Sequence, residues 1–323
     1  MNLELIEQLV CMKQTSTHKF MFSFLKKHYN KVVNDKSFVY AVGDIPIALV
    51  AHMDTVFEDS KEQKELFYDQ KKQVLWCPQG AGFDDKAGLA AIIEIVTSGL
   101  KPHVILTTDE EIGGVGASVL ASRTNPFKDL RYFIQLDRRG KDDCVFYDCA
   151  NDEFTEYVEK FGFSTAWGSF SDISTLCPAW EIAGVNLSIG YEHEHTQQET
   201  LRVNWMYDTI EKVKTMLTSE MPSVFKYIED EFSWKKYYLD YFKTKCAKCG
   251  NHYLTEELFV VKSKDGKNEL WCPDCISRTK LNWCTSCFQA FETDGEPVIM
   301  DNCDNCKKKK ELGNNVQGNT ATV

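Results

Sequence analysis

The sequence predicts an α/β protein, a three-layer sandwich with a mostly parallel central sheet, followed by a smaller C-terminal domain. Short β-rich runs alternate with helical patterns over the first 220 residues, as in parallel sheets that are covered by helices. The chain has 323 residues, which is more than one compact core usually holds. Eight of its 13 cysteines form four close pairs after residue 240.

Helical patterns occur at both ends of the first region. Apolar side chains recur at helical spacing in residues 3–12 and 18–29, and residues 205–220 predict a closing amphipathic helix. The β-rich runs are residues 38–42, 46–51, 74–77, 103–108, 132–136 and 185–190. Between the third and fourth runs, residues 88–99 (GLAAIIEIVTSG) have the length and apolar pattern of a core helix.

The cysteine pairs predict metal sites rather than disulfides. The N-terminus carries acidic residues early and lacks a signal-peptide pattern, so we expect a cytoplasmic, reducing compartment. Two thiolates separated by two residues can face one tetrahedral ion, and two such pairs complete its shell. We therefore expect two structural Zn²⁺ sites of four cysteines each. The pairs are Cys246/Cys249, Cys272/Cys275, Cys284/Cys287 and Cys303/Cys306.

Two arrangements of these pairs are open. In the simplest, the first two pairs hold one ion and the last two hold the other; the alternative is a cross-braced arrangement. Residues 252–271, with a turn at Asp265-Gly266, and residues 288–301 predict two short hairpins. The region resembles paired zinc ribbons or a LIM-like tandem, in which the metal supplies much of the folding energy.

Charge and hydropathy limit the partners. The net charge of −11 argues against a general nucleic-acid binder, and no apolar run approaches the length of a membrane span. After residue 240 there are 12 basic and 11 acidic residues, so eight thiolates and two Zn²⁺ bring the loaded domain to about −3. Lys307 to Lys310 are adjacent lysines before a polar tail, typical of a solvated segment. A protein partner therefore fits this domain better than duplex nucleic acid.

Acid-base and metal-binding residues follow most of the predicted strands. His52 and Asp54 follow one strand, Asp109-Glu110-Glu111 another, Asp137 a third, and residues 191–195 (YEHEH) a fourth. GFDDKAG at residues 82–88 precedes the core helix. Ligands gather at the carboxyl ends of parallel strands. Any one of these residues could be an ordinary turn or cap residue, but five groups at one predicted edge indicate a site.

The motifs AHMDTV, GFDDKAG, TTDEEIGGVGA and EHEHTQQE, in this order, resemble those of the co-catalytic di-zinc peptidases of the M20, M28 and M42 families. The resemblance covers about residues 1–217 and excludes the cysteine pairs. It implies a zinc-peptidase fold and an amide hydrolase with two catalytic Zn²⁺ ions. Co²⁺ or Mn²⁺ could serve in their place.

Carried over residue by residue, the resemblance implies a role for each group. His52 and Asp137 would ligate one ion, Glu111 and His195 the other, and Asp84 would bridge them. Asp54 would fix the tautomer of His52. Glu110 would be the general base, taking a proton from the attacking water and passing it to the leaving amine.

The ligand chemistry agrees with this assignment. Two imidazoles and three carboxylates carry a charge of −3, so two Zn²⁺ ions leave a net +1 that acidifies water and polarises a carbonyl. His193 is a competing ligand, but the H-T-x-x-E sequence that starts at His195 favours the latter.

Several nearby residues have two possible interpretations. Asp85 either supports the site or is an acid at a helix start, and we favour the helix start. Ser171-Asp172 is either a polar turn near the site or a helix cap, and we favour the cap. Arg138, beside Arg139, could hold a substrate carboxylate or be solvated. Tyr191 could donate to an oxyanion or merely pack.

The spacing between two of the implied ligands bears on the subfamily. Asp137 and His195 are only 58 residues apart, too close for the lid domain that some M20 members insert there. We therefore expect a catalytic domain at 1–219, a helical linker at 220–241, a double zinc domain at 242–310 and a flexible tail at 311–323.

The function predicted from these residues is that of a di-zinc exopeptidase, an aminopeptidase for short peptides. Two alternatives remain at this stage. One is a deacylase or amidase of an N-acyl substrate, because the bond chemistry is the same. The other is a non-catalytic protein that acts through its zinc domain.

Overall fold

The structure, a computed structural model, describes residues 3–57, 64–220, 223–230, 243–254, 258–286 and 289–307. The chain divides into two compact units, Met1–Glu231 and Phe232–Val323. The larger unit has two hydrophobic cores and the smaller unit has one. Cys287 and the tail after Lys307, which belong to the predicted zinc domain and its C-terminal extension, lie outside the described residues.

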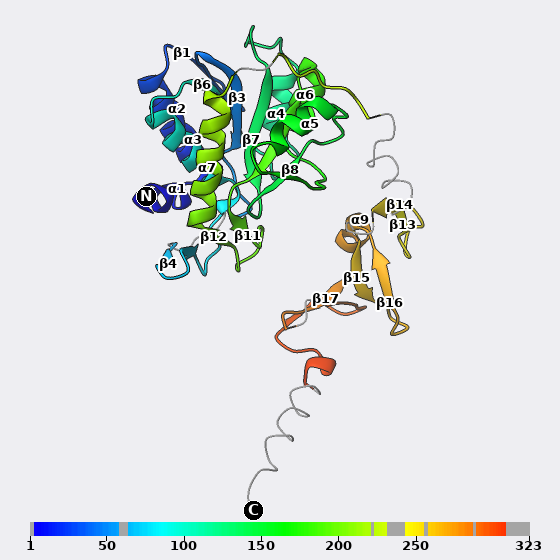
Figure 1. Ribbon diagram of the computed structural model, residues 1–323. Helices are drawn as coiled ribbons and strands as arrows, with labels where there is room; N and C mark the ends of the chain where they lie inside the picture. Colours follow the sequence, from blue (N-terminus) through cyan, green and yellow to red (C-terminus); the bar gives the residue numbers. More distant parts are fainter. Residues whose placement is uncertain are drawn as a thin grey trace, which may run out of the picture. The chain divides into compact units, whose positions relative to one another are not determined.

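An eight-stranded sheet forms the centre of the larger unit (Figure 1). Its four middle strands, β6, β3, β7 and β10, pair in parallel, whereas β1-β2, β2-β6 and β10-β8 pair antiparallel. In spatial order the strands are β1 (Lys31–Asn34), β2 (Phe38–Val42), β6 (Pro102–Thr107), β3 (Ile45–His52), β7 (Tyr132–Arg138), β10 (Gly184–Ser188), β8 (Asp143–Val145) and β9 (Ser164–Thr165). The predicted α/β class with a mostly parallel central sheet is confirmed.

Helices cover both faces of this sheet. In Figure 1, α1 (Leu3–Val10), α2 (Gln14–His28), α3 (Phe83–Thr97) and α7 (Val203–Thr218) lie on one side. On the other side are α4 (Val115–Ala121) and α6 (Ile173–Trp180). Successive side chains of a strand point to opposite faces, so Leu49 and Ala51 enter the first core while Ala48 and Val50 enter the second.

Helix α3 is the most deeply buried helical element of the larger unit, as its continuous apolar sequence predicts. Its Gly88 lies close to β7, because a Cβ there would come within 2.4 Å of the carbonyl oxygen of Leu136. The packing therefore fixes the start of α3 against the end of the strand that carries Asp137.

A second, four-stranded sheet lies outside the central one. It consists of β11 (Tyr191–Glu192), β12 (Thr200–Arg202), β5 (Val74–Trp76) and β4 (Phe67–Asp69), in that order. The β-rich run at 74–77 is thus a strand of this smaller sheet. The other five predicted runs form β2, β3, β6, β7 and β10 of the central sheet.

The segment between Asp137 and His195 contains β8, α5 (Asp152–Glu159), β9, α6 and β10. Three of these elements are strands of the central sheet, so the segment completes the larger unit.

Residues 223–230, the main described part of the linker expected at 220–241, are not helical; residues 221–222 and 231–241 lie outside the described residues. The described segment is extended: Lys226 bridges to Ile182 and Glu229 bridges to Cys149. Phe225 is buried in the first core, where its ring contacts Phe154. Burial of this apolar side chain holds the segment against the larger unit, which a solvated helical linker would not require.

The smaller unit contains a hairpin, a five-stranded sheet and a short helix. The hairpin is β13 (Lys243–Lys245) with β14 (His252–Leu254). The sheet has the order β16 (Asn268–Trp271), β15 (Phe259–Lys262), β18 (Ala290–Glu292), β17 (Leu281–Cys284) and β19 (Ile299–Met300). The helix is α9 (Pro273–Ser277). Strands β15 and β16 pair antiparallel around Gly266, whose φ of +78° suits glycine, as the predicted turn at Asp265-Gly266 requires.

The hairpin predicted at 288–301 is wrong. Both of its strands, β18 and β19, pair with β17 rather than with each other. The chain reverses just after Cys284, whose N–H donates to the carbonyl of Gln289. The turn therefore starts at the first cysteine of this pair, and the Thr293–Gly295 region connects β18 onward to β19.

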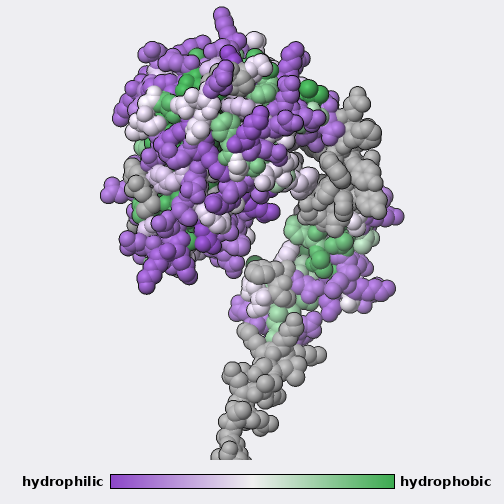
Figure 2. All heavy atoms as spheres, in the orientation of Figure 1, coloured by the Kyte–Doolittle hydropathy of each residue, from purple (hydrophilic) through white to green (hydrophobic). Residues whose placement is uncertain are grey.

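The surfaces of the two units are mixed in polarity. The face of the larger unit in Figure 2 is predominantly hydrophilic, but both units expose single large apolar side chains, among them Ile112 and Trp167 in the larger unit and Phe259 and Ile299 in the smaller one. Among the described helices, none combines the length and the apolar character that crossing a bilayer requires.

Candidate metal centre

The carboxyl ends of the parallel strands bring the predicted ligands together. His52 ends β3 and lies in register with Thr107, the last residue of β6. The loop after β6 carries Glu110 and Glu111, and Asp137 lies near the end of β7. The register of the parallel strands therefore gathers residues that are up to 85 positions apart in sequence.

Asp84 occupies the centre of this group. Its Oδ1 lies 3.0 Å from Nε2 of His52, and its Oδ2 lies 3.1 Å from Nε2 of His195. His52 Nε2 is also 3.5 Å from Asp137 Oδ1. His195 Nε2 is 3.0 Å from Glu111 Oε2. Each oxygen of Asp84 thus faces a different imidazole, and each imidazole also faces a further carboxylate, which is a geometry that two cation sites could share.

The donor atoms fit metal ions. Ligand atoms of His52, Asp84 and Glu111 all lie within 4.8 Å of one another. The other oxygen of Glu111, Oε1, is buried and has no hydrogen-bond partner among the described residues. Imidazole nitrogens and carboxylate oxygens suit Zn²⁺ and other divalent first-row ions. The imidazole in contact with this cluster is that of His195 rather than His193.

Asp85 is a rival ligand, since its carboxylate also lies within 4.8 Å of donor atoms of His52 and Asp137. However, Oδ2 accepts from the N–H of His52 (3.2 Å) and Oδ1 from the N–H of Gly88 (2.9 Å). Both oxygens are thus occupied by backbone donors. Asp85 is completely buried and accepts the N–H of a residue in the first turn of α3, so the expected acid at a helix start is present, and its second oxygen also joins α3 to β3.

Asp54 supports three members of the site. Its Oδ1 lies 3.3 Å from Nδ1 of His52, on the side of the ring opposite the cluster. Its two oxygens also accept the N–H groups of Glu110 and Glu111, each at 3.1 Å. One carboxylate therefore orients a histidine on β3 and the loop after β6.

Asp137 is held by three side chains. Gln135 Nε2 (3.1 Å) and Ser171 Oγ (2.9 Å) donate to Oδ2, and the hydroxyl of Tyr191 donates to Oδ1 (3.2 Å). Asp172, next to Ser171, is completely buried, accepts from Thr107 Oγ1 and makes no side-chain cap bond to α6. The helix-cap interpretation of Ser171-Asp172 is wrong, because both side chains turn toward the strand ends.

Glu199 is the last residue of the motif EHEHTQQE, and the sequence predicts no role for it. It is buried, and its carboxylate accepts the N–H groups of Gly82 (2.6 Å) and Asp84 (3.0 Å). It therefore fixes the backbone that carries the central aspartate. Its position four residues after His195 is the only sequence signal for this contact.

The acidic surroundings favour cations strongly. Hydrogen bonds to Asp84 and Glu111 raise the pKa of His195 to about 11. Burial by itself would lower the pKa of His52, but Asp137, Asp54 and Asp84 outweigh it and raise that pKa well above its usual range. Burial and the neighbouring Asp84 raise the pKa of Asp137 to about 7. The cluster thus holds more negative charge than its imidazoles neutralise, and divalent ions would relieve that repulsion.

Glu110 faces a cleft of about 260 Å³ beside the cluster. Burial, together with repulsion from Asp137 and Asp172, raises the pKa of its carboxyl to about 9. The cleft is also lined by Arg138, Tyr191 and the half-exposed aromatic residues Trp167 and Phe170. It is therefore polar where the ligands lie and aromatic on the wall formed by residues 167–170.

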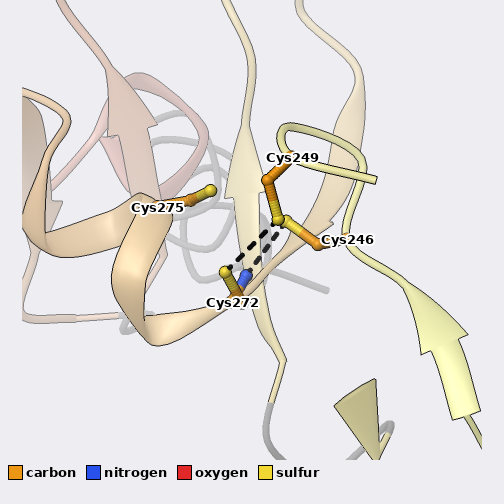
Figure 3. A group of neighbouring side chains, drawn as sticks. All are labelled: Cys246, Cys249, Cys272 and Cys275. Atoms are coloured by element: carbon orange, nitrogen blue, oxygen red, sulfur yellow. Dashed lines mark hydrogen bonds between the residues drawn. The ribbon is translucent and has the colours of Figure 1, made fainter. Parts of the chain in front are cut away.

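The smaller unit brings the cysteines together in the sequential arrangement. Cys246, Cys249, Cys272 and Cys275 point toward one another (Figure 3), with their sulfurs within 4.8 Å. Cys284, Cys303 and Cys306 form a second group of the same kind, and Cys287, the expected fourth member, lies outside the described residues.

The sulfur geometry fits zinc. Cys249 and Cys272 have sulfurs 3.8 Å apart, and those of Cys284 and Cys306 are 3.9 Å apart. A tetrahedral ion with bonds of about 2.3 Å separates its sulfurs by about 3.8 Å, whereas a disulfide would need about 2.05 Å. In each group a sulfur also accepts a backbone N–H, at 3.3 Å in Cys246 and 3.2 Å in Cys284.

Backbone donors also favour the thiolate form. Burial would raise the pKa of Cys246, but the N–H groups of Cys249, Cys272 and Lys248 outweigh it and lower that pKa to about 6. A thiolate is the form that binds Zn²⁺.

Comparison with solved structures finds the same fold among peptidases. The aminopeptidase PepT from Bacillus cereus ATCC 10987 is similar with a TM-score of 0.54 and 16% identity, over 67% of this chain and 96% of that one. A tripeptidase from Staphylococcus aureus subsp. aureus mu50 has a TM-score of 0.54 and 13% identity over the same shares of the two chains, 67% and 96%. The TET aminopeptidase from the marine sediment archaeon Thaumarchaeota archaeon SCGC AB-539-E09 has a TM-score of 0.54 and 15% identity, again over 67% and 96%.

Sequence comparisons add nothing to this. No protein-family model matches the chain, and no curated protein matches it either. At identities this low the likeness shows the fold, and the predicted zinc-peptidase-like α/β architecture is confirmed.

Proposed function

We propose that this chain is a zinc-dependent aminopeptidase that hydrolyses short peptides in the cleft beside Asp84. The observation that carries the proposal is the position of Asp84, whose two oxygens face different histidines, each of which also faces a further carboxylate. Similarity in fold to an aminopeptidase and a tripeptidase supports the reaction class.

We assign the ligands in two pairs around Asp84. His52 and Asp137 would hold one ion, His195 and Glu111 the other, and Asp84 would serve both. Two divalent ions held in this way supply Lewis acidity that activates a water and polarises the amide carbonyl. Co²⁺ or Mn²⁺ would fit the same donors.

Glu110 is assigned the proton transfers. Its carboxylate lines the cleft, while its backbone N–H is held by Asp54. An oxygen of the Glu110 carboxylate takes a proton from the attacking water and then delivers it to the nitrogen of the leaving amine. Cations close to Glu110 would lower its raised pKa and so favour the ionised form that accepts the proton.

The neighbouring side chains orient the proposed ligands and exclude water from the substrate. Asp54 keeps the His52 ring aimed at Asp84, and Glu199 keeps Asp84 in place. The hydroxyl of Tyr191 donates to Asp137, so we assign this residue to positioning Asp137 rather than to an oxyanion. Trp167 and Phe170 would shield an apolar part of the substrate from water.

The smaller unit would hold two structural Zn²⁺ ions. Four cysteines complete a tetrahedral shell and leave no open position for a substrate, so these ions would stabilise the fold and not take part in hydrolysis. We assign this unit a role in contacting a protein partner or the substrate.

A Glu110→Gln variant tests the mechanism. We expect it to bind zinc like the wild type and to lose at least about 100-fold in kcat, because Gln cannot accept the proton. Amino-acid p-nitroanilides and N-acyl amino acids, assayed side by side with metal content from plasma mass spectrometry, separate a peptidase from a deacylase. Unchanged turnover by the variant would contradict the role of Glu110, and turnover of the N-acyl compounds alone would replace the peptidase by a deacylase.

A further inference from the structure

We propose that Arg138 forms a carboxylate-binding subsite in the cleft, so that the preferred substrates carry a carboxylate close to the scissile bond. This inference rests on the proposed hydrolysis in the same cleft and adds a substrate class to it.

The Arg138 side chain has donors to spare. It ends β7, directly after Asp137, and lines the cleft. Its side chain is only 15% exposed, and Nε is buried without a hydrogen-bond partner among the described residues. Its nearest carboxylate oxygen is that of the half-exposed Asp143, 3.5 Å from Nη2, beyond the range of a charge-assisted hydrogen bond. The guanidinium therefore makes no hydrogen bond to the described residues, and its terminal nitrogens at the cleft remain available to a ligand.

Gly168 keeps this guanidinium uncovered. A Cβ at Gly168 would lie 3.4 Å from Nη1 of Arg138, 3.0 Å from Val145 and 3.2 Å from the ring of Tyr147. Any larger side chain would therefore fill the space in front of the guanidinium. The hydroxyl of Tyr147 accepts from Asn186 at 2.9 Å, which fixes the ring on the other side.

The charges of the cleft single out Arg138. Arg139, its neighbour, is 62% exposed and pairs with Glu194 at 2.8 Å, so its charge is already compensated. The remaining charged groups around the cluster are mostly acidic, and the two proposed ions would offset about half of that charge. A substrate carboxylate would find its complement at Arg138, where a planar fork can bind both oxygens.

The position limits how far this carboxylate lies from the reacting bond. Arg138 is the residue after a metal ligand, and an extended peptide spans about 3.3–3.6 Å per residue. A carboxylate bound here therefore lies within one or two residues of a carbonyl at the cluster. The source is either the C-terminus of a dipeptide or tripeptide, or an acidic side chain next to the bond.

Two pairs of substrates separate these sources in the zinc-loaded full chain. Leu-Gly against Leu-Gly-amide tests the C-terminal carboxylate, and Glu-p-nitroanilide against Gln-p-nitroanilide tests an acidic side chain. We expect the wild type to prefer the carboxylate member of one pair, and Arg138→Met to reduce that preference in kcat/KM at least tenfold. Arg138→Lys should retain part of it, and the matched control Arg139→Met should leave both ratios within about twofold of the wild type.

Other outcomes have defined meanings. Equal losses on both members of each pair, or unchanged ratios, would overturn the subsite and leave the peptidase proposal intact. If Arg138→Met does not fold, Gly168→Ala replaces it, since its methyl group would cover the guanidinium and should lower the same ratio.

Binding alone provides a test that needs no turnover. Calorimetry of the zinc-loaded Glu110→Gln variant with Leu-Gly and with Leu-Gly-amide should show tighter binding of the free acid. In the double variant that also carries Arg138→Met, the two ligands should bind equally. If the wild type hydrolyses nothing, the peptidase proposal fails, but this measurement still decides the subsite. The subsite would be overturned if Leu-Gly and Leu-Gly-amide bind equally and if the α-amides of glutamate and of glutamine also bind equally.

Discussion

The two units gather metal-binding residues in opposite ways. In the larger unit, ligands come from separate strand ends, and the arrangement is set by the register of a sheet that has a large hydrophobic core of its own. In the smaller unit, cysteines come from short turns, and the core is a few residues that include Cys246 and Cys272. The first unit would fold and then bind metal, whereas the second would need metal to fold.

The kinds of ligand follow the same division. Histidines and carboxylates beside a cleft leave room for water and substrate, while four thiolates close the shell of an ion. Catalytic and structural metals would thus be separated by residue type within one chain.

Removal of metal should produce the largest difference between the two units. A chelator in reducing buffer should unfold the smaller unit, because a structural Zn²⁺ contributes about 10–16 kcal/mol to such domains. The larger unit should keep its secondary structure. Two-dimensional NMR of the full chain would show loss of the amide signals of one unit only, and added Zn²⁺ should restore them. If both units unfold together, or neither does, the inference that only the smaller unit needs metal to fold is wrong.

Asp54→Asn should weaken only the larger unit's site. The amide loses the negative charge beside His52 Nδ1 and keeps only one oxygen for two backbone N–H groups, so metal affinity or kcat/KM should fall about 10- to 100-fold. Asp208→Asn, on the exposed side of α7, is the matched control and should have no effect. A competing chelator with a visible absorbance measures the affinity. An Asp54→Asn protein with normal affinity and turnover would remove Asp54 from the site.

Glu199→Gln has the smallest expected effect. Its side chain accepts from Gly82 and Asp84, and Gln retains only one oxygen for these donors. We expect a loss of about 1 kcal/mol in the free energy of unfolding of the larger unit, measured by urea denaturation. The exposed Glu211→Gln, which loses only a surface pair with Lys214, should change it by less than about 0.5 kcal/mol. Equal changes in the two variants would mean that Glu199 does not hold the Asp84 loop.

The parts of the fold that follow from local patterns were predictable from sequence. The strand that ends at His52 and the helix after Gly82 are continuous apolar runs, and their lengths indicate their type. The hairpin around Gly266 is marked by its turn residues. These elements depend on neighbours in sequence.

Pairings that depend on distant residues were not predictable. Strand β19 has two residues and joins the sheet by pairing with β17. A two-residue strand is too short to show an alternating pattern in the sequence. Residues 223–230 are extended because Phe225 fills a gap in a core built from other segments. A local pattern cannot contain this information.

The site divides in the same manner. The structure places His52, Asp84, Glu111, Asp137 and His195 in one cluster, and strand ends and motifs had marked each of them. The supporting residues Ser171, Asp172 and Glu199 are single polar residues whose partners lie far away in sequence. Such contacts become visible only when the strands are placed side by side.

The zinc content of wild type and Asp84→Asn tests the central claim most directly. If Asp84 serves two open sites while the cysteines fill two closed ones, the wild type holds about four zinc ions per chain and the variant about two, with the smaller unit still folded. Plasma mass spectrometry of dialysed protein gives these numbers. A wild type with about two ions, or an Asp84→Asn variant that keeps about four, would contradict the account.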